Sequence, residues 1–560
     1  MSSEAVGIII IVAIILAATG LTMTESNRRK KERFRRLTRT GWGKPSDTEY
    51  TAEEFSSISH YAQRKEQAFS VDDITWNDLD MDSVYLQANR CMSSCGDDVL
   101  WEMMRSPSFS SESLDERDQL AETFSGNEDV RFKCQMILSD IGRMRTMSVY
   151  DYILLLRSAK NIGTLPFAAL AIATLADIVF LFFMPLPAVL ILCVLIIVNI
   201  SVSLRMHSAT QVYITSFQCI LRLLNAADAF RKIKDPCLEK YVRSMNRDAE
   251  AFSAFRRGAF LVTSSAQVAN GLTDVLLEYV KMFFHVDLIK FDQMLNAYRG
   301  HEEECFDLIE NIGTVDACIS IASFRISCGK WCRPEFKDDS DCSIRISDMA
   351  HPLIENPVTN SIDMTGGNLV TGSNASGKST FLKNIAISAI LAQSIDTVTA
   401  SEYRAPFLRV MTSMALADNL QSGESYFIVE IKSLKRILDA AKDPAPLLCI
   451  IDEVLRGTNT IERIAASSQI LKSLSAANVL SFAATHDIEL SYILERIYTN
   501  WHFEEEIQEH DVVFNFHLKT GRATTRNAIK LLEVLDYDPA IVEGAREAAA
   551  RFEQTGEWKL

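Results

Sequence analysis

A charge-free apolar run over residues 5–23 stands near the start of the printed sequence, and eight cations lie directly after it between Arg28 and Arg39. A cleaved signal peptide carries its positive charge before the apolar run, so the reversed order favours an N-terminal transmembrane anchor over 1–24. The positive-inside rule then places most of the chain in the cytoplasm. We interpret residues 25–69 as a basic juxtamembrane segment and linker, attracted to anionic lipid headgroups. The alternative is that these cations grip DNA phosphates.

A second apolar block, over residues 164–204, divides at Met184-Pro185-Leu186-Pro187 into two runs of helical length. Proline cannot continue a helix through that turn, so the pattern predicts a transmembrane hairpin with both ends on the cytoplasmic side. Asp177 lies inside the first run, where its cost in lipid falls if it faces the partner helix or another subunit. The two blocks together predict three membrane spans and a multi-pass membrane protein. The alternative is a buried helical hairpin in a soluble core.

The remaining pattern separates a helical part of the chain from an α/β part. Residues 131–163 and 205–310 carry apolar positions at helical spacing with few glycines, which predicts long helices within two helical regions over 70–163 and 205–335. From Cys342 onward short apolar runs, glycine turns and helices alternate, as in a domain built on a mostly parallel sheet. The main boundary is therefore expected near residue 335, and the α/β domain is expected over 336–560.

Composition narrows the class of protein. A chain of 560 residues with 48% hydrophobic content can form several domains with cores of their own. The net charge of −16 excludes a uniformly basic nucleic-acid coat. The twelve cysteines are scattered, with no histidine at zinc-ligand spacing, so we expect free thiols in a reducing compartment.

The strongest chemical motif is a glycine-rich segment in which Gly372, Gly377, Lys378 and Ser379 satisfy G-x-x-x-x-G-K-[ST]. A short apolar run precedes it and an apolar-periodic helix follows, which is the context of a phosphate-binding loop. The glycines let backbone N–H groups surround phosphates, and the helix N-terminus favours the anion. We expect Lys378 to reach the β- and γ-phosphates and the Ser379 hydroxyl to ligate Mg²⁺.

Two further apolar runs end in polar residues. One, over 447–451, ends in Asp452 and Glu453, and a buried strand that ends in two acids needs a cation nearby. Asp452 is expected to hold Mg²⁺ through water, and Glu453 to polarise the attacking water. The other run precedes His486, a candidate sensor of the γ-phosphate if its strand lies beside the first two. The alternatives are an acidic helix cap and an ordinary surface histidine.

Four segments occur in the order and spacing of one known family, the MutS-type DNA mismatch repair ATPases of the ABC class. They are 371–380, 422–430, 452–458 and 484–486. The tail over 521–551 resembles that family's C-terminal dimerisation helices, and parts of 89–117 and 316–320 resemble its helical core more weakly. The resemblance implies an α/β P-loop ABC-type ATPase domain at the C-terminus. It would follow an all-α MutS-core-like region that carries the transmembrane helices.

The resemblance also implies roles for individual residues. Asn374 and Thr380 would belong to the phosphate loop, with ATP and Mg²⁺ as cofactors. Ser425 would reach across to the nucleotide of a partner subunit, which implies a homodimer with composite sites. The loop from Arg456 to Thr460 would communicate between the two sites.

The sequence departs from the family at three places. Leu455 stands where the family has glycine, and Glu424 stands where it has arginine. The first 130 residues contain no Phe-x-Glu or Tyr-x-Glu, the wedge with which mismatch-reading relatives probe DNA. Mismatch-specific recognition by that route is therefore not expected.

Two functions from different classes fit these patterns. The first is a membrane-anchored MutS-like ATPase that dimerises, hydrolyses ATP with Mg²⁺ and couples hydrolysis to binding nonspecific or branched DNA. The alternative is a nucleotide-gated membrane scaffold with little hydrolysis and no DNA binding, which Leu455 and Glu424 favour and Glu453 and His486 oppose. A subunit of an ABC transporter fits least, because the Leu-Ser-Gly-Gly-Gln signature is absent.

Overall fold

The computed structural model divides the chain into two compact units, each with its own core. The helical unit comprises 1–65, 89–102 and 119–324, and the α/β unit comprises 66–88, 103–118 and 325–560. The structure describes residues 25, 28–46, 49–64, 67–144, 146–263, 272–337, 342–373, 376–414, 426–456, 458–508, 511–523, 528–534, 537–556 and 558. The predicted anchor over 1–24 lies outside these residues.

Helices make up the first unit, as the apolar spacing predicts. Its elements are α2 (Ala52–Ala62), α5 (Ser94–Arg105), α6 (Ser111–Gly126), α7 (Glu128–Ile141), α8 (Val149–Ser158), α9 (Leu165–Phe180), α10 (Pro185–Phe230), η1 (Pro236–Leu238), α11 (Glu239–Glu250), α12 (Ser253–Arg256), α13 (Phe260–Thr263), α14 (Leu272–Phe284), α15 (Val286–Tyr298) and α16 (Glu302–Ser327). Three of them, α5, α6 and α16, have part of their length in the other unit.

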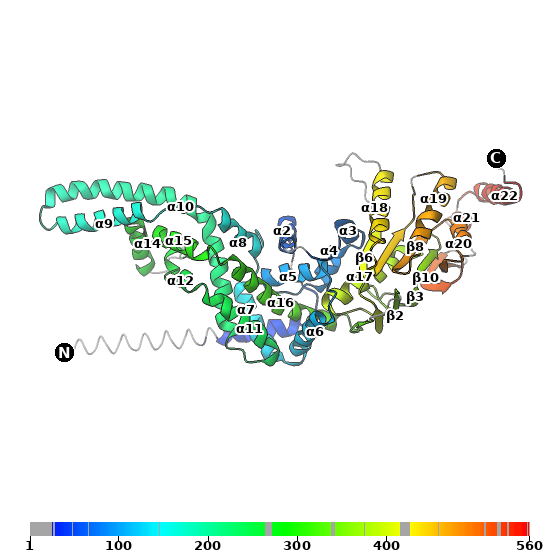
Figure 1. The fold of residues 1–560 in the computed structure, drawn as a ribbon, viewed down its shortest axis with the longest axis horizontal. Helices are drawn as coiled ribbons and strands as arrows, with labels where there is room; N and C mark the ends of the chain where they lie inside the picture. Colours follow the sequence, from blue (N-terminus) through cyan, green and yellow to red (C-terminus); the bar gives the residue numbers. More distant parts are fainter. Residues whose placement is uncertain are drawn as a thin grey trace. The chain divides into compact units, whose positions relative to one another are not determined.

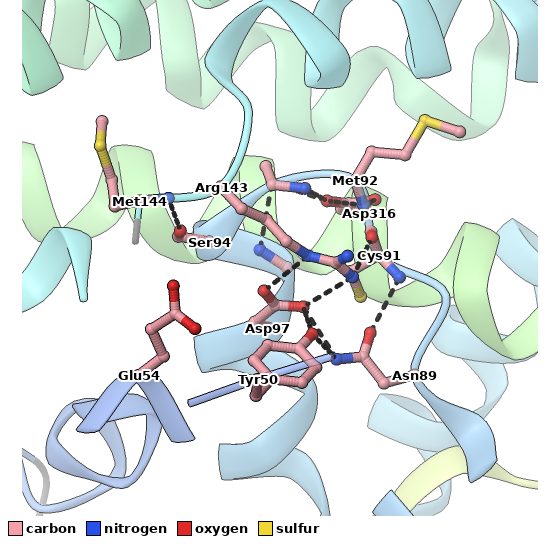
Figure 2. Close-up of polar contacts among 12 residues, drawn as sticks. Tyr50, Glu54, Asn89, Cys91, Met92, Ser94, Asp97, Arg143, Met144 and Asp316 are labelled. Atoms are coloured by element: carbon pink, nitrogen blue, oxygen red, sulfur yellow. Dashed lines mark hydrogen bonds and ion pairs between the residues drawn. The ribbon is translucent and has the colours of Figure 1, made fainter. Parts of the chain in front are cut away.

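A polar network lies inside the helical unit around Asp97 of α5, drawn in Figure 2. Its carboxylate forms an ion pair with Arg143 at 3.0 Å and accepts hydrogen bonds from Asn89 at 2.8 Å and Tyr50 at 3.1 Å. Burial raises the Asp97 pKa, while Arg143 and the hydrogen-bond donors oppose the rise. The network borders a cavity of about 590 Å³, which Glu54 also lines. Each buried acceptor of Asp97 therefore has a partner, as a buried charge requires.

Two glycines allow α5 and α16 to cross closely within the same unit. A Cβ atom on Gly313 would lie 2.4 Å from the Cys95 carbonyl oxygen, and one on Gly96 would lie 2.4 Å from Asp316 Oδ2. The Asp316 carboxylate accepts the Ser93 N–H at 2.8 Å and its hydroxyl at 2.6 Å. The close crossing thus brings a buried acid to the residue directly before α5, where helix N–H groups lack intrahelical acceptors.

The apolar block forms a helical hairpin, α9 followed by the long helix α10, as Figure 1 shows. Among the described residues, the segment Pro185–Met206 of α10 is the one helix long and apolar enough to cross a membrane. Helix α9 has 16 residues and is shorter than a span requires. Of the three predicted membrane spans, the described residues therefore support one, at Pro185–Met206. The physical reason is that α9 ends at Phe180 and residues 181–184 form the turn, which leaves the first apolar run with a short helix.

The second unit has the mostly parallel sheet that the alternating pattern predicts. The six-stranded sheet has the order β10-β9-β4-β8-β7-β6, with β10 antiparallel at one edge and the other neighbours parallel. A four-stranded sheet has the order β1-β5-β2-β3. The strands are β1 (Glu335–Phe336), β2 (Ser343–Met349), β3 (Asn360–Thr365), β4 (Gly367–Thr371), β5 (Glu402–Ala405), β6 (Arg409–Ser413), β7 (Leu447–Asp452), β8 (Val479–Thr485), β9 (Tyr498–Gln508) and β10 (Asp511–Thr520).

Every residue of β4, β7 and β8 is buried, which explains their continuous apolar runs. The helices of this unit are α3 (Asp73–Asp78), α4 (Met81–Ala88), α17 (Lys378–Ile395), α18 (Tyr426–Ala440), α19 (Thr460–Ser473), α20 (Ile488–Ile493), α21 (Ala528–Val534) and α22 (Pro539–Thr555).

Upstream residues complete the α/β unit, so its boundary differs from the single division expected near residue 335. Asp78 of α3 accepts the Thr412 hydroxyl at 2.6 Å and the Met414 N–H at 2.9 Å, at the end of β6. Arg325 is buried and forms an ion pair with Asp118 at 2.6 Å. These contacts join positions hundreds of residues apart, and local periodicity carries no information about them.

We predict that Gly313→Ala lowers the stability of the helical unit by about 1–3 kcal/mol, because the added methyl overpacks the α5–α16 crossing. Thermal unfolding followed by circular dichroism measures the change. Gly126→Ala in the same unit is the matched control, since a Cβ there meets nothing within 4 Å. Equal unfolding temperatures for the two variants would contradict the close crossing.

Candidate functional site

The glycine-rich turn joins β4 to the N-terminus of α17. Gly372 has φ 149° and Gly377 has φ 96°, a region in which glycine is favoured. A Cβ atom on Gly377 would lie 2.9 Å from the ring of Phe516. Helix α17 begins directly after Gly377 without a side-chain cap, so its first N–H groups point into the turn. Such a turn suits an anion.

Lys378 lies buried in this turn, and its ammonium donates to the carbonyl oxygens of Gly372 at 2.8 Å and Ser373 at 2.6 Å. The side chain therefore folds back along the loop, with its charge beside the backbone amides. Thr380 lines a neighbouring cavity. Asn374, which the sequence places in the same loop, lies outside the described residues.

The predicted metal ligands meet at the edge of the sheet. The Ser379 hydroxyl donates to Asp452 Oδ2 at 2.5 Å, which connects the first turn of α17 to the end of β7. A hydroxyl and a carboxylate are hard oxygen donors, and Mg²⁺ is commonly held by one or two such groups together with substrate phosphates. In the described part of the chain, no group of three or more His, Cys, Asp or Glu side chains is arranged to hold a metal ion by itself. The donor set fits Mg²⁺ bound jointly with a phosphate.

Glu453 and His486 also lie together, because β7 and β8 are parallel neighbours. The Glu453 N–H donates to the Ala484 carbonyl at 3.0 Å, and His486 Nε2 lies 2.8 Å from Glu453 Oε1. Arg456 forms an ion pair with the second carboxylate oxygen. Burial raises the Glu453 pKa, but the His486 hydrogen bond and the charges of Arg456, His486 and Lys378 outweigh it and hold the pKa below its usual value. Glu453 is therefore ionised at neutral pH.

The turn that carries His486 is fixed from a neighbouring helix. Arg463 of α19 donates to both carboxylate oxygens of Asp487, at 2.8 and 2.6 Å. This two-point contact is more directional than a single ion pair and holds the end of β8 in place.

A cavity of about 350 Å³ lies beside the glycine turn, and the sequence gives no indication of it. Gly377, Phe381, His351 and Phe516 are among its lining residues. Burial, reinforced by the charge of Lys383, lowers the His351 pKa to about 4, so the imidazole is neutral at pH 7. The cavity offers aromatic and uncharged surface next to an anion-binding turn, as a nucleotide base requires.

Asn360 holds Phe516 at this cavity. Phe516 has φ 55° and interrupts the register of β10 between Phe514 and Leu518. The Asn360 amide donates to the Phe516 carbonyl at 3.0 Å and accepts the Leu518 N–H at 2.8 Å. An irregularity of this kind redirects a side chain out of the regular strand pattern. An alternating pattern of strand residues predicts no such change.

Leu455, a departure from the family, has its side chain in the core rather than in the site. It is 6% exposed and has φ 60°, and Glu453 has φ 58°. Left-handed backbone costs a non-glycine residue about 1–3 kcal/mol. The buried carboxylate of Glu430 on α18 accepts the Leu455 N–H, and burial raises the Glu430 pKa against that hydrogen bond. Sequence reasoning missed Glu430 because the contact joins two elements through a buried loop.

Residues 415–425 lie outside the described part of the chain. They include Ser425, the residue expected to reach a partner's nucleotide, and Glu424. The described site therefore consists of the glycine turn, Lys378, Ser379, Asp452, Glu453 and His486.

Comparisons with known proteins identify this arrangement. Residues 368–553 match the family model described as MutS domain V. The DNA mismatch repair protein MutS of Methanosarcina barkeri is 29% identical over 279 residues, covering 47% of this chain and 30% of the relative. MutS protein homolog 4 of Homo sapiens is 29% identical over 295 residues, covering 49% and 31%. DNA mismatch repair protein MutS 2 of Haloarcula marismortui is 33% identical over 189 residues, covering 33% and 20%.

The segment similar to MutS domain V contains the glycine turn and the acid pair at the edge of the parallel sheet. The resemblance to the MutS-type DNA mismatch repair family, predicted from the motifs, is thereby confirmed over about half of this chain. The chain spans about a third of the length of the curated relatives it matches.

We predict that Glu430→Ala destabilises the α/β unit by about 1–3 kcal/mol, because it leaves the buried Leu455 N–H without an acceptor. Glu430→Gln keeps an acceptor oxygen, so its loss of stability should be less than half that of Glu430→Ala. Chemical denaturation of the full chain measures both, with the exposed Lys435→Ala on the same helix as control. Equal stability of Glu430→Ala and the control would contradict the assigned contact.

Proposed function

We propose that this protein is a MutS-type ATPase that binds ATP with Mg²⁺ in the α/β unit and hydrolyses it as a homodimer. The observation that carries the proposal is the meeting of Ser379 with Asp452 at 2.5 Å, beside Glu453 and His486 at 2.8 Å. In this arrangement Ser379 and Asp452 would hold the metal ion, and the Glu453 carboxylate would polarise a water molecule at the same edge of the sheet. One of the similar curated proteins is described as a DNA mismatch repair protein.

In this proposal the α17 N-terminus and Lys378 bind the phosphates, with Asn374 and Thr380 in the same loop. Ser379 and Asp452 hold Mg²⁺, which neutralises phosphate charge when bound. Ionised Glu453 orients and polarises the attacking water, and His486 contacts the γ-phosphate side. The base occupies the cavity at His351 and Phe516. Ser425 of each chain completes the partner's site, which makes the dimer necessary.

The buried position of Leu455 favours hydrolysis over the alternative, a nucleotide-gated membrane scaffold. Leu455 adopts the left-handed backbone that glycine would adopt, and its side chain packs in the core. It therefore leaves the space in front of Glu453 open. The ion pair with Arg456 and the His486 contact keep that carboxylate charged and oriented.

We place the protein at a membrane, with the α/β unit in the cytoplasm. Residues 5–23 are the first attachment, and the exposed apolar surface of the α9–α10 hairpin is the second. DNA is the proposed partner of the helical unit, bound as nonspecific or branched DNA. In the basic segment, Arg35 and Arg39 form ion pairs with Glu128 and Asp129 of the same unit, which lowers the charge available for phosphates.

We predict that Lys378→Ala weakens ATP binding at least 100-fold, because it removes the cation of the phosphate loop. Glu453→Gln should keep ATP affinity and reduce steady-state turnover about 100-fold or more, since the amide cannot polarise water. Calorimetry and phosphate release measure the two effects, with the exposed Lys472→Ala as control. Binding without turnover in the unmodified chain would favour the scaffold.

For DNA, we predict binding whose affinity falls steeply with salt and is equal for matched and mismatched duplexes. Phosphate contacts release counterions, and the first 130 residues contain no Phe-x-Glu or Tyr-x-Glu wedge. Fluorescence anisotropy with matched, mismatched and branched duplexes at several salt concentrations tests this. Absence of binding at low salt would remove DNA from the function and leave the ATPase intact.

A further inference from the structure

The hairpin of α9 and α10 has an uninterrupted apolar end. From Ile178 to Val198 the sequence contains no charged, amide or hydroxyl side chain. Nearly all of these residues are exposed or half-buried, and Ala188 is the one buried residue among them. Phe182 is 84% exposed, Phe183 78% and Leu186 81%. Apolar exposure on all sides of two helices is typical of contact with lipid, whereas a protein partner would require one apolar stripe.

A buried polar contact marks where the body of the helical unit meets the hairpin. The Asn199 amide donates to the Thr174 hydroxyl at 3.2 Å, and Asn199 Oδ1 lies 2.8 Å from His285 Nε2. All three side chains are buried. The part of α10 that extends beyond this contact, from Pro185 to Val198, is about 21 Å long at roughly 1.5 Å per residue. The hydrocarbon core of a bilayer is about 30 Å thick. The projecting part is shorter than this core, and the segment Pro185–Met206 that is long enough to cross it includes Asn199, which this contact holds against the body of the unit.

The turn between the helices also fits the interior of a membrane. A turn that emerged on the far side would meet water, yet residues 181–187 have only apolar side chains. Four of their backbone donors are satisfied within the turn: the N–H groups of Leu181 through Met184 bond to carbonyls of Asp177, Val179 and Phe180. Pro185 and Pro187 have no N–H to satisfy. In hydrocarbon each unsatisfied donor costs several kcal/mol, so these bonds and prolines are what a turn in lipid requires.

Exposed cations lie at the other end of the hairpin. Lys160 precedes α9, and Arg205 follows the apolar part of α10. Both therefore lie on the same side as the body of the unit, where headgroups and water would surround them.

We propose that the α9–α10 hairpin enters the bilayer from the cytoplasmic side and ends within it, with the turn at residues 181–187 in the hydrocarbon. Lipid covers the apolar surface of this hairpin. The hairpin therefore holds the chain at the membrane without crossing it. This inference rests on the membrane placement proposed above and is independent of ATP hydrolysis.

The test measures accessibility in the full-length protein reconstituted into vesicles. A membrane-impermeant maleimide is supplied either outside only or on both sides, and peptide mass spectrometry reports each cysteine. The exposed native Cys237 is the internal control, because it lies on the body of the unit. We expect Cys237 to react, while Cys193 in the hairpin and a Phe183→Cys variant stay at least ten-fold less reactive in both arms. All three should react once the sample is denatured in SDS.

Two results would overturn the proposal. Reaction of Phe183→Cys only when reagent is present inside the vesicles would show that the hairpin crosses the membrane. Reaction of Phe183→Cys or Cys193 with outside reagent alone would show that lipid does not cover the hairpin, as for a protein-bound surface. Neither readout depends on ATP, so loss of turnover would leave this test unaffected.

A charge at the turn gives a second, matched test. Phe183→Glu should raise the reactivity of Cys193 at least ten-fold, because a carboxylate that faces hydrocarbon, unlike the buried Asp177, is costly to keep there. Leu204→Glu, beside Arg205 at the water-facing end and 71% exposed, should leave Cys193 protected. Both positions are exposed, so neither variant disturbs the core. Continued protection of Cys193 in Phe183→Glu would contradict a turn held in lipid.

Discussion

The hydrogen bond between the Ser379 hydroxyl and the Asp452 carboxylate connects the start of α17 to the end of β7, and the proposed chemistry depends on it. It exists because β4, β8 and β7 are parallel neighbours whose carboxyl ends share one edge of the sheet. The same edge brings His486 to Glu453. Phosphate, metal and water can therefore be bound within one small region by residues that are far apart in the sequence.

Strain near this edge is balanced by buried contacts. Glu453 and Leu455 both have left-handed backbone, and Phe516 does too, at the cavity beside the glycine turn. Glu430 accepts the Leu455 N–H, and Asn360 brackets Phe516 with two hydrogen bonds. Unusual conformations persist where surrounding groups fix them, and here they direct a carboxylate and an aromatic ring toward the proposed nucleotide site.

Much of the fold follows from the sequence, because continuous apolar runs predict buried parallel strands and a glycine turn of this pattern is expected between a strand and a helix. Because the carboxyl ends of parallel strands meet at one edge, the sequence also predicts which site residues lie close together. They are Lys378, Ser379, Asp452, Glu453 and His486. The roles of Glu430, Asn360 and Phe516 do not follow from the sequence, since they depend on contacts between distant elements and on left-handed backbone at residues other than glycine. The packing of Asp78 against β6 and the short reach of the hairpin likewise need three-dimensional information. Asn374 and Ser425 remain predictions.

The central claim is that Ser379 and Asp452 jointly hold the magnesium ion of a bound ATP. Calorimetric titration of ATP, with Mg²⁺ and with EDTA, into the unmodified chain, Ser379→Ala, Asp452→Asn and the double variant measures this most directly. Mg²⁺ should strengthen ATP binding in the unmodified chain, each single variant should lose most of this gain, and the double variant should lose little more. An undiminished effect of Mg²⁺ in both single variants would contradict the claim.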